Sequence, residues 1–68
     1  MIDIIDISYI YGHHIVIKYG QESGFDLYVN RNKDNTTLLK KHYKTYSGAK
    51  TRYNKECNHY RARESRLA

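Results

Sequence analysis

Apolar and polar residues alternate at the start of the chain, where isoleucine and tyrosine, both common in strands, dominate residues 2–11. The two-residue period of a strand places four apolar side chains on one face: Ile5, Ile7, Tyr9 and Tyr11. Asp6 and Ser8 fall on the opposite face. The pattern predicts a strand whose isoleucine face is buried.

A second alternating segment follows after a short break. Gly12-His13 fits a tight turn, and residues 14–19 then place Ile15, Ile17 and Tyr19 on one side. Two such strands joined by a two-residue turn are typical of a β-hairpin.

A third alternating segment covers residues 25–30, between a glycine-containing loop at 20–24 and a polar turn at 30–35. Its inward positions are Phe25, Leu27 and Val29. The clean alternation predicts a third strand with one buried face.

Residues 36–43 are predicted to form a fourth strand. Their central stretch, Leu38-Leu39-Lys40-Lys41, is also compatible with a helix. The sheet is therefore expected to have three or four strands.

The last third of the chain has the period of a helix. From residue 49 onward the apolar positions are spaced by 4, 4 and 3 and form one stripe: Ala49, Tyr53, Cys57 and Tyr60. Thr45 or Ser47 can cap the first turn, because a hydroxyl oxygen accepts hydrogen bonds from its unpaired N–H groups. No Gly or Pro interrupts residues 49–68, so we expect a helix from about 46 to 64.

These elements predict an α+β fold, with a three- to four-stranded antiparallel sheet packed against one C-terminal helix. A chain of 68 residues buries only about 60% of its unfolded surface. We therefore expect one small domain over residues 1–68, with the strands within 2–43. The predicted core is Ile5, Ile7, Ile15, Ile17, Phe25, Leu27, Val29, Ala49, Tyr53, Cys57 and Tyr60.

Charge is distributed unevenly along the chain, whose formal net charge is +5. Residues 1–39 carry three Lys and Arg against five Asp and Glu, a net charge of −2. Residues 40–68 carry nine against two, a net charge of +7. This asymmetry points to an anionic partner for the second half.

The positive charge is sorted on the predicted helix. At 100° per residue, five basic side chains fall within about 80° of one another and form a ridge: Arg52, Lys55, His59, Arg63 and Arg66. Lys50 and Arg61 lie on the other flank of the apolar stripe. Such a ridge is typical of contacts with a phosphate backbone, and a basic solvated face without a partner is the alternative interpretation.

Three function classes follow from these features. A non-enzymatic protein that binds DNA or RNA through the ridge is the first. The second is a phage-type inhibitor whose ridge binds the acidic surface of a host nucleic-acid-handling or defence protein, as an anti-CRISPR-like protein would. The small size and the Asn-, Lys-, Tyr- and Ile-rich composition resemble those of bacteriophage accessory proteins.

The third class is a ribonuclease. Gly12-His13-His14 resembles the early Gly and His of small His-dependent ribonucleases from bacterial toxin–antitoxin systems, which implies His13 as the catalytic group. This chain lacks the leading helix of that family and the Ser between Gly and His. A turn histidine without catalytic function is the alternative interpretation, and we predict no catalytic residues.

Residues 43–49, Tyr-Lys-Thr-Tyr-Ser-Gly-Ala in the sequence, resemble the strand-to-helix junction of the arm-binding domain of phage integrases. That resemblance implies the order of strands followed by helix. In that family the sheet contacts DNA, whereas here the charge lies on the helix.

No cofactor or metal is predicted, because the spacing of His13, His14, His42, Cys57 and His59 matches no zinc pattern. The single Cys57 fits a reducing compartment. The chain has no long apolar run and no basic, apolar N-terminal segment. We therefore expect a cytoplasmic protein without membrane contact, and a homodimer is compatible with so small a core.

Overall fold

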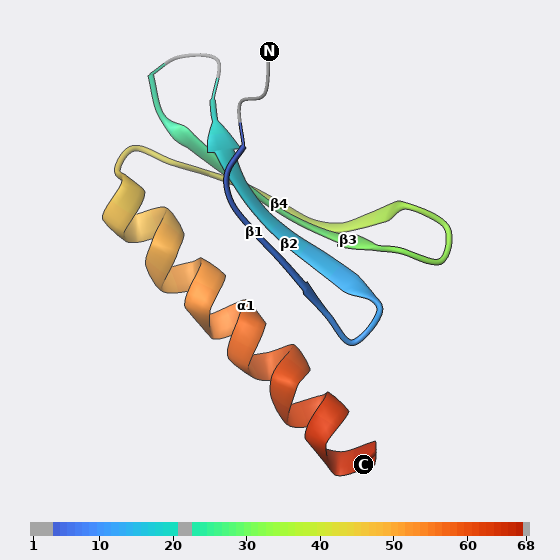
Figure 1. Ribbon diagram of the computed structural model, residues 1–68. Coiled ribbons are helices and arrows are strands. Elements are labelled where there is room, and N and C mark those ends of the chain that lie inside the picture. The colour runs from blue at the N-terminus through green and yellow to red at the C-terminus, as the bar shows by residue number, and fades with distance from the viewer. Residues whose placement is uncertain (1–3, 21–22, 68) are drawn as a thin grey trace.

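The chain folds into an antiparallel sheet with one helix against one of its faces (Figure 1). The structure is a computed structural model that describes residues 4–20 and 23–67. The strands, in spatial and sequence order, are β1 (Ile4–Ile10), β2 (His13–Tyr19), β3 (Phe25–Arg31) and β4 (Thr36–Tyr43), followed by the helix α1 (Tyr46–Leu67). The predicted α+β fold and the fourth strand are confirmed.

The turn between β1 and β2 lies one residue earlier than predicted. Its central residues are Tyr11 and Gly12, both with positive φ, 52° and 70°, while His13 is already the first residue of β2. A two-residue hairpin turn favours positive φ at both positions, which glycine adopts freely and tyrosine does not. Tyr11 is held there by the helix, because its N–H donates to Glu64 Oε2 at 3.1 Å.

Strand β1 presents the face opposite to the predicted one. Ser8 pairs with the buried Ile15, and Ile10 pairs with His13, so both point toward the helix. Ile7 pairs with Val16 on the outer face and is exposed, which makes its predicted place in the core wrong. Residues 2 and 3 of the predicted strand lie outside the described residues.

β1 is oriented this way because its polar side chains are hydrogen-bonded to the polar ends of helix side chains. The Ser8 hydroxyl is hydrogen-bonded to the hydroxyl of Tyr53. The Asp6 carboxylate accepts a hydrogen bond from the Tyr46 hydroxyl, and that bond raises the pKa of Tyr46. A register shift between residues 4 and 6 still lets Ile5 pack partly against the core.

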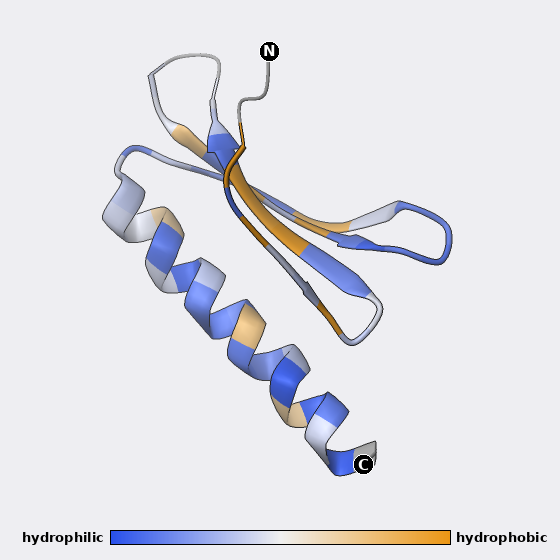
Figure 2. Cartoon of the chain, viewed as in Figure 1, coloured by the Kyte–Doolittle hydropathy of each residue, from blue (hydrophilic) through white to orange (hydrophobic). Residues whose placement is uncertain are grey.

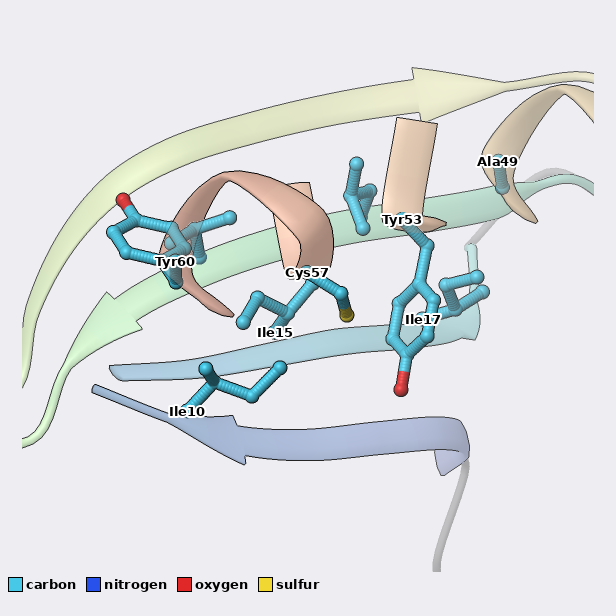
Figure 3. Packing of buried hydrophobic residues seen from close by; sticks show 9 residues of the cluster. Ile10, Ile15, Ile17, Ala49, Tyr53, Cys57 and Tyr60 are labelled. Carbon is cyan, nitrogen blue, oxygen red and sulfur yellow. The ribbon is translucent and has the colours of Figure 1, made fainter. Parts of the chain in front are cut away.

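The core is one layer of side chains between the sheet and the helix (Figure 3). Four residues of β2 and β3 are fully buried in its centre: Ile15, Ile17, Leu27 and Val29. The helix contributes the whole predicted stripe: Ala49, Tyr53, Cys57 and Tyr60. Phe25 packs partly against this cluster, and the sequence interpretation missed the buried Ile10 and Val16.

Thr45 caps the helix, as one of the two predicted alternatives, because its Oγ1 accepts a hydrogen bond from the N–H of Gly48 at 3.2 Å. The helix extends to Leu67, three residues beyond the predicted end at 64. Its buried positions stop at Tyr60, and residues 61–66 are all exposed. Most residues along the helix are hydrophilic (Figure 2).

The loop between β2 and β3 is closed by the N–H of Gly20, which donates to the carbonyl of Gly24 at 2.8 Å. The ring of His42 from β4 lies against both glycines, and its Nδ1–H donates to Asp26 Oδ1 at 2.7 Å. A Cβ at Gly24 would lie 2.4 Å from the His42 ring and 2.9 Å from the Tyr43 carbonyl oxygen. This position therefore requires glycine.

We expect Gly24→Ala to lower the free energy of unfolding by about 1–3 kcal/mol, the usual cost of overpacking. Thermal unfolding followed by circular dichroism measures the effect. Gly48→Ala is the matched control, since its Cβ would meet only the Thr45 hydroxyl at 3.3 Å and the side chain of Tyr43 beyond it. Equal stability of the two variants would contradict the close contact at Gly24.

Replacing Tyr53 by Ala should destabilise the protein by about 3–5 kcal/mol, because it removes a buried aromatic ring from a thin core. Tyr53→Phe keeps the ring and loses only the hydrogen bond with Ser8, at a cost of about 1 kcal/mol. Denaturant unfolding of both variants separates the two contributions. A melting temperature unchanged by Tyr53→Ala would show that the helix does not pack on this stripe.

Candidate nucleic-acid interface

The basic side chains on the two flanks of α1 make different contacts. On the flank toward β1, Lys50 Nζ lies 3.4 Å from Asp6 Oδ2 and 4.4 Å from the centroid of the Tyr53 ring. Burial lowers the pKa of Lys50, but the charges of Asp6 and Tyr46 outweigh it, so the pKa is raised overall. Lys50, one of the predicted site residues, therefore holds the helix on the sheet.

The predicted ridge occupies the opposite flank of the helix, which faces away from β1. At its N-terminal end, Arg52 Nε donates to Glu56 Oε2 at 3.0 Å, four residues further along the helix. This half-buried pair neutralises one ridge cation. The remaining ridge residues lie nearer the C-terminus.

Lys55, His59 and Arg66 are exposed, and none of them forms a salt bridge with another described residue. Arg63 is also exposed, and its guanidinium carbon lies 5.6 Å from the centroid of the Tyr11 ring. A shallow hollow runs along this part of the helix, lined by His59, Ala62, Arg63 and Arg66. Together Lys55, His59, Arg63 and Arg66 form what we call the exposed ridge.

The two carboxylates of the helix are both occupied by other groups. Glu56 binds Arg52, and Glu64 accepts the N–H of Tyr11. Arg61, the remaining predicted site residue, is exposed on the same flank as Lys50. Positive charge near the end of the helix is therefore left without acidic partners within the described part of the chain.

Strand β4 adds positive charge on the helix side of the sheet, which the sequence interpretation had not assigned to the site. Lys41 pairs with the buried Leu27 across the ladder, so its side chain leaves the sheet on the same face as the helix. It is exposed, as is Lys44 directly after the strand. The alternation of Leu39, Lys41 and Tyr43 was the signal for this placement.

His13 lies inside a stack of aromatic rings. Its ring centroid is 4.3 Å from that of Tyr60 and 6.1 Å from that of Tyr11, both nearly parallel. Its Nδ1–H donates to the Tyr11 carbonyl oxygen at 2.7 Å. Among the described residues no second acid or base is hydrogen-bonded to it, so these contacts fit a structural role.

His14 points to the opposite face of the sheet from His13, as strand alternation requires. Its Nδ1–H donates to Asn32 Oδ1 at 2.6 Å, and its Nε2 accepts from Asn30 Nδ2 at 3.0 Å. The two adjacent histidines therefore cannot act on the same ligand.

The described residues contain no group of three or more His, Cys, Asp or Glu side chains that could hold a metal ion. Cys57 is buried in the core, whereas His59 is exposed on the ridge. Within the same part of the chain, no helix is both long and apolar enough to cross a membrane.

We expect His13→Ala to lower the free energy of unfolding by about 1–2 kcal/mol through the lost ring stacking and hydrogen bond. His13→Phe, which keeps an aromatic ring on Tyr60, should lose less. Purified wild-type protein incubated with RNA should leave the RNA intact. Cleavage by the wild type that disappears in both variants would instead identify His13 as a catalytic residue.

Comparison with known proteins gives no family assignment. No protein-family model matches the chain, and neither a curated protein nor a solved structure matches it significantly.

Proposed function

We propose that this chain is a non-enzymatic nucleic-acid-binding protein whose C-terminal helix contacts the phosphate backbone. The observation that carries the proposal is the exposed ridge, in which Lys55, His59, Arg63 and Arg66 follow one side of the helix and form no ion pair with a described acidic side chain. Nucleic acid presents a regular line of negative charge that such a row can follow.

The sorting of charge on α1 supports an anionic partner. The helix carries six Lys and Arg against two Glu, and both Glu side chains are engaged elsewhere. Like charges three or four residues apart on a helix repel one another and destabilise it by a few tenths of a kcal/mol per pair. A polyanion bound along the ridge would remove this repulsion.

The length and position of the helix also suit an extended partner. From Lys55 to Arg66 the ridge covers about 16 Å of helix axis at 1.5 Å per residue. Residues 61–66 are all exposed, so this part of the helix contributes little to the core. Its basic residues Arg61, Arg63 and Arg66 are thus available for contacts outside the chain.

A reducing, cytoplasmic setting belongs to the same proposal. Cys57 is a free thiol, only 2% exposed, and packs as an apolar residue between the helix and β2. Such a thiol needs no disulfide partner and is compatible with the compartment in which nucleic acid is handled.

The test is a double charge reversal at two residues of the exposed ridge, Lys55→Glu with Arg66→Glu, neither of which forms an ion pair with a described residue. Affinity for DNA or RNA should fall at least tenfold, and the slope of log affinity against log salt should flatten by about 2, one unit per lost phosphate contact. Fluorescence anisotropy between about 50 and 200 mM salt measures both quantities.

Single reversals provide the matched control. Arg66→Glu should weaken binding clearly, whereas Lys33→Glu makes the same change in net charge in the β3–β4 turn, away from the helix, and should have little effect. Circular dichroism should show the same fold in all variants. Wild-type binding that barely responds to salt and survives the double reversal would refute the proposal.

A pull-down from cell lysate with and without nuclease addresses the acidic-protein alternative. We expect the captured partners to be lost after nuclease treatment. A protein that stays bound after nuclease, and is released by the double reversal, would assign the ridge to an acidic protein surface instead.

A further inference from the structure

The face of the sheet turned away from the helix is not covered by any described element (Figure 1). One row of paired residues crosses it from edge to edge: Ile7, Val16, Tyr28 and Lys40. Val16 is only 6% exposed although nothing packs over it from another element, because its neighbours in the row shield it. The face therefore has an apolar centre.

Tyr28 stands in this centre between two lysines. Lys18 Nζ lies 4.7 Å and Lys40 Nζ 5.7 Å from the centroid of the Tyr28 ring. The cations come from the strands on either side, β2 and β4. Both ammonium groups lie over the aromatic ring, so a base that stacks there displaces a lysine, whose charge then becomes available to a phosphate.

A second aromatic ring lies on the same face. Tyr9 pairs with His14, its side chain is 70% exposed, and the two ring centroids are 5.8 Å apart. His14 is fixed by Asn30 and Asn32, and Asn30 Oδ1 accepts a further hydrogen bond from Thr37 at 2.7 Å. The Tyr9 ring thus lies beside a histidine whose two ring nitrogens are both hydrogen-bonded.

The positive charge of this face favours an anionic ligand. Its one acidic side chain within the described strands, Asp26, accepts the hydrogen bond of His42. Lys18 and Lys40 make no salt bridge with a described residue. A second copy of the chain stacked on this face would bring like charges together around Tyr28, which opposes a symmetric dimer here.

We propose that the outer face of the sheet is a second binding site, at which Tyr28 and Tyr9 stack on the bases of single-stranded nucleic acid and Lys18 and Lys40 bind its phosphates. Stacking on tyrosine is sequence-tolerant, because every base presents an aromatic face. The site lies on the face opposite the helix, and it goes beyond the contact proposed for the exposed ridge.

The spacing of the two tyrosines favours single-stranded over double-stranded nucleic acid. Tyr9 of β1 and Tyr28 of β3 are separated by two β-strand spacings across the sheet and by two residues along it. Ordinary sheet spacings place their Cα atoms about 12 Å from each other. That distance far exceeds the 3.4 Å between neighbouring bases of a duplex strand. The two rings therefore take separate, unstacked bases, which a duplex does not offer.

The experiment titrates the whole protein with a single-stranded oligonucleotide and with the duplex of the same sequence, in low salt. The single strand should bind at least tenfold more tightly, and it should quench the tyrosine emission, which no tryptophan masks. The double variant Tyr9→Leu, Tyr28→Leu should lose about tenfold in affinity for the single strand, as expected when stacked bases lose their ring partners.

Controls separate this site from the ridge and from effects on folding. Tyr28→Phe keeps the ring and should retain affinity with less quenching, and Lys18→Gln with Lys40→Gln should weaken binding while the melting temperature stays close to that of the wild type. Normal single-strand affinity in the Leu variant, combined with loss in Lys55→Glu, Arg66→Glu, would overturn the sheet site and leave the ridge standing. The reverse result would support the sheet site alone.

Two other outcomes also overturn the inference. Equal affinity for single and double strands would show that bases do not stack on the two tyrosines. A protein that sediments as a dimer, and becomes monomeric in the Tyr28→Leu variant, would assign this face to a second copy of the chain.

Discussion

The rest of this structure depends on how a tyrosine-rich helix packs against a thin sheet. Tyr53 and Tyr60 are the largest buried side chains of the helix, and each carries a hydroxyl at the far end of its ring. The Tyr53 ring spans the apolar centre, and its hydroxyl is hydrogen-bonded to Ser8 of β1. Figure 3 shows this hydroxyl turned toward that strand. An aromatic ring with a polar end needs an apolar centre and a polar rim, and this sheet provides both.

This constraint explains the orientation of β1. If Ile7 and Tyr9 faced the helix, the Tyr53 hydroxyl and the Lys50 ammonium would lose the partners that Ser8 and Asp6 provide. For the buried Tyr53, the free energy lost on leaving its hydroxyl unpaired is about 1–3 kcal/mol. No buried side-chain nitrogen or oxygen among the described residues lacks a hydrogen-bond partner. The apolar residues displaced from the core then lie on the outer face, around Val16.

The same packing leaves two surfaces of different chemistry. The helix is fixed by its stripe and by Lys50, so its opposite flank and its last turns project cations away from the core. The outer sheet face carries aromatic rings and two lysines instead. If both proposals hold, the ridge contacts phosphates and the sheet contacts bases, a division of roles common in nucleic-acid recognition.

The sequence by itself determined the elements, because each depends on local periodicity. The stripe of Ala49, Tyr53, Cys57 and Tyr60 set the buried side of the helix, and the alternation in residues 25–30 set that of β3. The basic ridge could be located in the same way, since the angle between helix positions is fixed.

Only the tertiary structure decided which face of β1 is buried, where the first turn lies and which ridge cations form ion pairs. Residues 4–10 carry isoleucine on both faces, so the pattern allows either face to be buried, and the choice depends on hydrogen bonds to residues 40 and 45 positions away. Tyr11 adopts positive φ because Glu64 holds its N–H from the far end of the chain. Such pairings do not follow from local periodicity, because partners distant in sequence come together only when the helix docks on the sheet.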